Sequence, residues 1–183
     1  EMGWQGDLRL AARVDIHATE AMAAELVFER VAGDLHVVGP DSTQLLGLSA
    51  FRLAVSAHDG LWTFQPEFRG RSLGELEGRL QVQSTPERRW PQGDDRVSGQ
   101  VQARVADIGI WGAWLPPGWR LAGTLNTRAA LSGAFRSPHL VGELGGSGLG
   151  VRNLLQGVNV RDGEVRVKLE GDTARIERFT LKG

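Results

Sequence analysis

The chain of 183 residues contains no cysteine. Disulfide bonds, thiolate metal sites and cysteine nucleophiles are therefore excluded, and the composition is compatible with an oxidising compartment. The sequence also lacks any run of about 20 apolar residues, so no segment is expected to span a membrane as a helix. No signal peptide opens the chain, and both ends fall within strand-like patterns, which indicates a fragment of a larger protein.

An excess of charge of either sign is also missing. Lys and Arg number 21 against 22 Asp and Glu, which leaves a formal net charge of −1. Proteins that bind nucleic acid usually carry a strongly basic surface, so no nucleic-acid partner is expected.

Residue patterns that carry catalysis or bind metal are scarce. The four histidines are scattered without the spacing of a metal site, and Asp94-Asp95 beside Arg96 is typical of a charged turn. The glycine-rich segment 145–150 lacks the Gly-Lys-Ser/Thr of a phosphate-binding loop. The sequence therefore predicts a non-enzymatic protein with no catalytic residues, no metal site and no cofactor.

Alternation of apolar and polar residues is the dominant pattern. It is clearest in residues 121–151, where Leu121, Leu125, Ala129 and Leu131 fall on one face of an expected strand. We expect a second strand after Pro138, where one strand should break or shift register. Gly145-Gly146 is expected to form a turn.

Similar alternating segments, separated by turn residues, recur along the chain. Asp59-Gly60 predicts a tight hairpin turn, and residues 85–95, with two prolines, predict a loop. Residues 26–31 and 35–38 are expected to pair as a hairpin. In total the pattern predicts about a dozen short strands and an antiparallel, all-β fold over residues 1–183 as a single segment.

In residues 107–115 a short helix competes with the strand pattern, although Gly109 and Gly112 weaken the helix. Ile108, Trp111 and Leu115 follow helical spacing, and Asp107 is placed to cap the first turn. With Trp114 and Trp119 this segment forms a tryptophan cluster around two prolines. Its three tryptophans are expected to pack as a hydrophobic plug at one end of the sheet, with a gate or a contact for a membrane or partner as the alternative.

A Gly-x-Leu/Val frame recurs eight times at expected strand starts. With it, several segments resemble the C-terminal region of the TamB family, labelled DUF490, within the AsmA-like/TamB superfamily. The resemblance is carried by LAGTL (121–125), LSGAF (131–135), SPHLVGEL (137–144), GLGVR (148–152), RVAGDL (30–35) and DGEV (162–165).

The resemblance implies a β-taco, a long antiparallel sheet folded into a U-shaped trough with an apolar interior. It further implies a protein anchored in the inner membrane of a Gram-negative bacterium and extending through the periplasm. The implied partner is a TamA-like outer-membrane β-barrel protein. The implied functions are assembly of outer-membrane proteins, including autotransporters, and phospholipid transport between the two membranes.

A trough of this kind would hold phospholipid acyl chains or unfolded outer-membrane protein strands along its apolar face. The alternative is a closed core, in which case the domain is a structural adaptor that docks a barrel partner through its sheet edges. Periodicity alone does not separate the two. The residues expected to line the trough are Leu53, Val55, Leu80, Val82, Val101, Leu125, Leu131, Leu140, Leu144, Val165, Val167 and Ile176.

Overall fold

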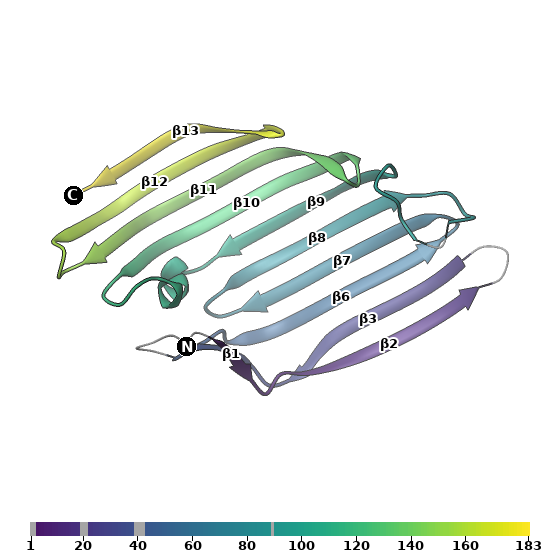
Figure 1. Ribbon diagram of the computed structural model, residues 1–183, viewed down its shortest axis with the longest axis horizontal. Helices are drawn as coiled ribbons and strands as arrows, with labels where there is room; N and C mark the ends of the chain where they lie inside the picture. The colour runs from purple at the N-terminus through teal and green to yellow at the C-terminus, as the bar shows by residue number, and fades with distance from the viewer. Residues whose placement is uncertain (1–2, 19–21, 39–42, 89) are drawn as a thin grey trace.

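The computed structural model describes residues 3–18, 22–38, 43–88 and 90–183, and it is almost entirely β-sheet (Figure 1). Ten strands form one open antiparallel sheet in the order β13-β12-β11-β10-β9-β8-β7-β6-β3-β2. The predicted all-β antiparallel fold is therefore confirmed. The ten strands are β2 (Arg9–Ala18), β3 (Met22–Ala32), β6 (Leu48–His58), β7 (Leu61–Gly70), β8 (Gly74–Gln83), β9 (Arg96–Val105), β10 (Arg120–Ala134), β11 (Ser137–Asn153), β12 (Val158–Gly171) and β13 (Thr173–Lys182).

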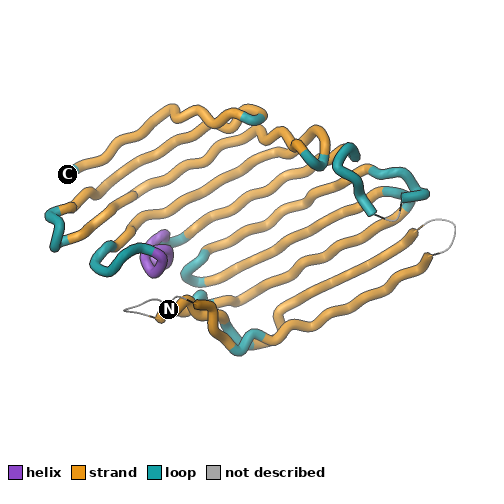
Figure 2. The backbone as a smooth tube through the Cα atoms, in the orientation of Figure 1, coloured by secondary structure: helices purple, strands orange, loops and turns teal. Residues whose placement is uncertain are grey.

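A second, smaller sheet lies at one end of these strands. It has the order β1-β4-β5 and consists of β1 (Gly3–Gly6), β4 (Leu35–Val38) and β5 (Thr43–Leu45). A single 3-10 helix, η1 (Ile108–Trp114), lies at the same end (Figure 2). The Asp107 carboxylate accepts a hydrogen bond from the Gly109 N–H at 2.8 Å, so the predicted capped helical turn is confirmed.

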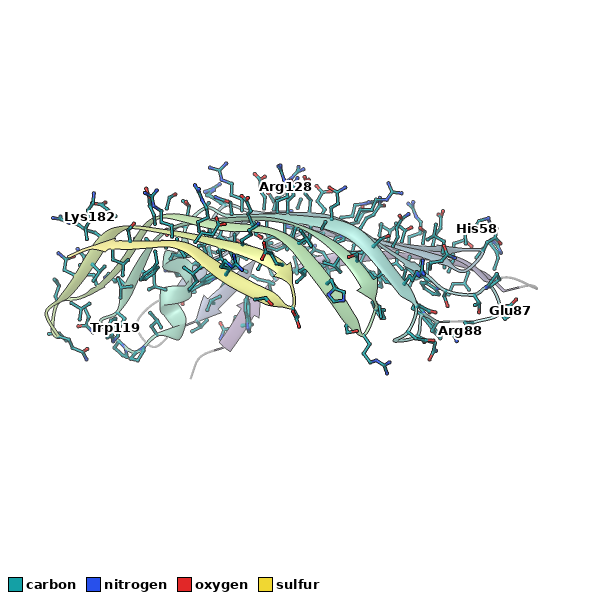
Figure 3. All side chains as sticks on the ribbon, turned by 90° about the horizontal axis from the view of Figure 1, so that it is seen from above. His58, Glu87, Arg88, Trp119, Arg128 and Lys182 are labelled. Atoms are coloured by element: carbon teal, nitrogen blue, oxygen red, sulfur yellow. The ribbon has the colours of Figure 1, made fainter. Side chains whose placement is uncertain are left out.

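The large sheet is bent, and its two faces differ in chemistry (Figure 3). Successive residues of a strand point to opposite faces, so cross-strand partners share a face. One such row joins Leu144, Val167 and Ile176, whereas the neighbouring row joins Glu143 and Lys168. Most of the apolar residues lie on the concave face, and most of the charged residues, Arg128 among them, lie on the convex face.

Two of the turn predictions are confirmed. Asp59 and Gly60 both have positive φ angles, 48° and 78°, as a type I′ hairpin turn requires, and they join β6 to β7. Residues 84–95 form the longer connection between β8 and β9. Pro138 is the second residue of β11 and pairs with Gly133, so the expected break lies just before it, at the 135–136 turn.

The turn predicted at Gly145-Gly146 is wrong, because β11 runs through both glycines. Gly146 pairs with Leu125 on one side and Val165 on the other. A Cβ atom on Gly146 would lie 2.8 Å from a Val165 methyl carbon and 2.9 Å from a Leu125 methyl carbon. This glycine therefore makes room for two neighbouring apolar side chains.

The hairpin predicted for residues 26–38 is also wrong. β3 pairs with β2 and β6 in the large sheet, whereas β4 pairs with β1 and β5 in the small one. Gly33 has a φ of 82° and lies against the backbone of Asp7, where a Cβ atom would meet the Asp7 carbonyl oxygen at 2.2 Å. The chain thus leaves one sheet for the other at this glycine.

Candidate apolar groove

The concave face carries a continuous set of apolar side chains. Its members follow the cross-strand pairing from Val14 and Leu26 through Val55, Phe64 and Leu80, and onward to the strands of the C-terminal half. Ten of the twelve predicted lining residues are half-buried there; the other two are Val82 and Ile176. No second layer of sheet packs over the middle of this face in the described part of the chain.

Val82 differs from the other predicted lining residues because it is fully buried, with an exposed fraction of 0%. It belongs to a core that we call the Trp62 cluster, and so it does not line the open part of the face. The cluster consists of Ala24, Ala57, Trp62, Val82 and Val97.

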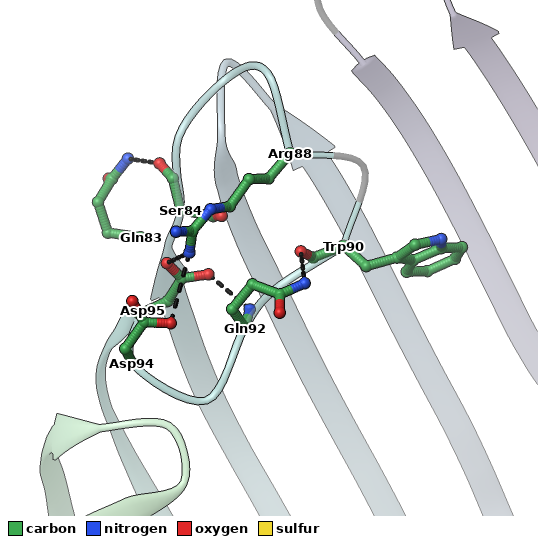
Figure 4. Close-up of polar contacts among 7 residues, drawn as sticks. All are labelled: Gln83, Ser84, Arg88, Trp90, Gln92, Asp94 and Asp95. Atoms are coloured by element: carbon green, nitrogen blue, oxygen red, sulfur yellow. Dashed lines mark hydrogen bonds and ion pairs between the residues drawn. The ribbon is translucent and has the colours of Figure 1, made fainter.

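The β8–β9 loop covers the Trp62 cluster. The Trp90 ring lies on the Trp62 ring, with centroids 5.2 Å apart and planes at 29°, so Trp62 is only 2% exposed. Asp95 holds the loop in shape, because its carboxylate accepts hydrogen bonds from the Gln92 N–H at 2.7 Å and from Arg88 at 3.0 Å (Figure 4). The hydrogen bond from the Gln92 N–H has the largest effect on the pKa of Asp95, and with the Arg88 guanidinium it keeps this pKa below its usual value although burial raises it.

At the opposite ends of the strands lies a second core, which we call the Leu46 cluster. It joins the small sheet and η1 to the large sheet, and Leu8, Leu35, Phe68, Leu73 and Trp111 pack against it. The cluster consists of Val37, Leu46, Leu48 and Ile110.

Asp34 ties the small sheet to the start of β6. Its carboxylate accepts hydrogen bonds from the backbone N–H groups of Leu35, Gly47 and Leu48, at 2.8, 2.9 and 2.9 Å. Burial raises the pKa of Asp34, but the three N–H donors together outweigh it, so the pKa lies below its usual value. The carboxylate therefore holds together the backbone segments beside the Leu46 cluster.

Two of the three side chains of the predicted tryptophan plug lie within the described residues. Trp111 packs against the Leu46 cluster, which agrees with packing at one end of the strands. Trp119 is half-buried just before β10, and the side chain of Trp114 lies outside the described residues. Sequence reasoning missed the contact in which Trp90 covers Trp62.

The two clusters define the shape of the concave face. They lie at opposite ends of the strands, since Trp62 and Phe68 are at the two ends of β7. The two outer strands are uncovered: on β2, Val14 and Ile16 are 56% and 50% exposed, and on β13, Ile176 and Phe179 are 65% and 62% exposed. The result is a continuous apolar strip across the concave side of the strands, uncovered at both sheet edges. We call it the groove.

The convex face is mostly polar, and its described residues do not converge on a site of functional groups. Open depressions of about 780 and 520 Å³ on it lie between side chains such as Glu77, Gln102 and Arg128. Among the described residues, no group of three or more His, Cys, Asp or Glu lies close enough together to hold a metal ion. None of the described helices has the length and apolar character needed to cross a membrane.

Comparison with known proteins adds no identification. No protein-family model matches this chain, and no solved structure matches it.

Proposed function

We propose that this chain is a non-enzymatic, TamB-like segment whose groove shields phospholipid acyl chains. The observation that carries the proposal is the half-exposed apolar surface formed by residues such as Leu80, Val101 and Leu125, with the two core clusters at the strand ends. Each CH2 group moved from water into such a groove contributes about 0.8 kcal/mol. An acyl chain can therefore bind without specific polar contacts.

The sequence resemblance supplies the setting of the proposal. It implies a segment in the periplasm, within a protein anchored in the inner membrane of a Gram-negative bacterium. A TamA-like outer-membrane protein is the proposed partner. The same groove suits an unfolded, amphipathic strand of an outer-membrane protein as a second client, because such a strand also has one apolar face.

Native mass spectrometry after incubation with phosphatidylethanolamine tests the proposal. We expect lipid adducts on the unmodified chain and their loss in Leu125→Arg, which places a charge in the groove. Val141→Arg is the matched control, because Val141 lies on the convex face and is 56% exposed. Absence of adducts on the unmodified chain, or equal adducts on Leu125→Arg, would reject acyl-chain binding.

A second candidate function is docking of a partner through the sheet edges. The outer strand β13 favours it, because all ten of its residues are exposed and no described strand pairs with its outer backbone groups. Capture of a TamA-like protein should then survive Leu125→Arg but fail with Thr180→Pro in β13. The opposite pattern would assign capture to the groove.

A further inference from the structure

Two adjacent leucines are the most exposed large apolar side chains described. Leu154 and Leu155 are 76% and 92% exposed, in the turn between β11 and β12. The turn is well formed, because the Asn153 side chain, which is buried, accepts a hydrogen bond from the Gln156 N–H at 3.2 Å. The leucines are therefore presented to solvent on an ordered tip rather than on a frayed segment.

A row of cations lies directly behind this tip. Arg120 pairs with Arg152 across β10 and β11, and Arg161 pairs with Lys182 across β12 and β13. Arg152 also pairs with Asn159, two residues from Arg161, so all four cations share one face. Lys182 and Trp119 lie at the same end of the sheet (Figure 3).

The row concentrates four positive charges at one end of the sheet. Like charges directly opposite one another on neighbouring strands repel, and here two such pairs stand side by side. Within the described chain none of the four cations forms a salt bridge, and Asp162, next to Arg161, is the acid nearest to them in sequence. An anionic surface would relieve this repulsion.

We infer that residues 152–161, together with Arg120 and Lys182, form a tip that binds an anionic membrane surface. Leu154 and Leu155 insert among the acyl chains, and the four cations lie at the level of the lipid phosphates. Exposed leucines distinguish this surface from a nucleic-acid site, which would leave them in water. The inference concerns the outside of the sheet and does not depend on what fills the groove.

Vesicle co-sedimentation tests the inference. We expect binding to phosphatidylcholine vesicles containing about 30 mol% phosphatidylglycerol, weak binding to phosphatidylcholine alone, and release as NaCl rises from about 0.05 to 0.5 M. Leu154→Ser/Leu155→Ser should weaken binding at least about tenfold. Arg120→Gln/Arg152→Gln should weaken it at least about tenfold as well, since each cation contributes about fivefold.

The matched control is Phe135→Ser/Arg136→Gln, which changes an exposed apolar residue and a cation in the turn at the opposite end of the sheet. This control variant should bind the vesicles as strongly as the unmodified chain does. The leucine variant should keep its melting temperature and its lipid adducts in native mass spectrometry, which separates the tip from the groove. Equal binding to neutral vesicles, or unchanged binding by the leucine variant, would overturn the inference.

Discussion

Trp90 covers Trp62 across the β8–β9 loop, with 61% of Trp90 exposed and 2% of Trp62 exposed. The loop thus closes the rim of the groove with one aromatic ring. Removing that ring should uncover the Trp62 cluster.

We expect Trp90→Ala to increase acrylamide quenching of Trp62 fluorescence and to lower the free energy of unfolding by about 1 kcal/mol, the usual contribution of an aromatic pair. Trp62 emission is isolated by subtracting the spectrum of a matched Trp62→Phe variant. Trp90→Phe is the control and should retain most of the protection. Unchanged quenching in Trp90→Ala would show that the ring does not protect Trp62.

Gly145 and Gly146 are neighbours on opposite faces of β11, and substitution by alanine should destabilise the chain to different extents at the two positions. We expect Gly146→Ala to destabilise the chain by about 1–3 kcal/mol, because its Cβ would lie within 3 Å of carbon atoms of both Leu125 and Val165. Gly145→Ala should cost less, since its Cβ would meet the end of the Asn126 side chain, which can move. Chemical denaturation of both variants measures the difference, and equal losses would contradict the packing described for Gly146.

The contact between Leu125 and Gly146 should make the effects of substitutions at these two positions non-additive. Leu125→Ala combined with Gly146→Ala should cost less than the sum of the two single changes, because the smaller side chain vacates the space that the new methyl group needs. Residues in contact usually couple by about 0.5 kcal/mol or more. Strict additivity in the double-mutant cycle would contradict direct contact between the two positions.

The lowered pKa of Asp34 should make the stability of the fold depend on pH. Its pKa is lowered in the folded chain, so its contribution to stability is complete above the unfolded value of about 3.9 and is lost as pH falls through the lower folded value. We expect Asp34→Asn to be less stable than the unmodified chain by about 1–3 kcal/mol at pH 7. The difference should shrink as the pH falls below about 4.

Melting temperatures measured across this pH range test the prediction. Asp162→Asn is the control, because the Asp162 side chain is exposed and accepts no hydrogen bond from any described residue, and its φ of 52° suits asparagine. If Asp34→Asn lowers stability equally at pH 3 and pH 7, the hydrogen bonds to the ionised Asp34 carboxylate are excluded as the cause.

Strand faces were predictable from the sequence because alternation is a local property. Leu125, Leu144 and Val167 were each assigned to the apolar side from their own strands, and the pairing places them on one concave face. The Asp59-Gly60 turn was predictable for the same reason, since both positive φ angles are set by the two residues themselves.

The remaining features depend on contacts between distant segments. Gly145-Gly146 has the composition of a turn, but strands on both sides pair with it and keep it extended. Gly33 also reads as a turn, yet only the approach of Asp7 shows that it carries the chain into another sheet. The covering of Trp62 by Trp90 has no periodic signal at all.

Site-specific photocrosslinking to a diacyl phospholipid tests the central claim most directly. A benzophenone amino acid is placed at Leu80 and Val101 on the concave face, and at their chain neighbours Arg79 and Gln100, which pair with each other on the convex face. The account predicts lipid adducts at Leu80 and Val101 and none at the two neighbours. Equal adducts at all four positions, or adducts on the convex face alone, would contradict the groove as the lipid-binding surface.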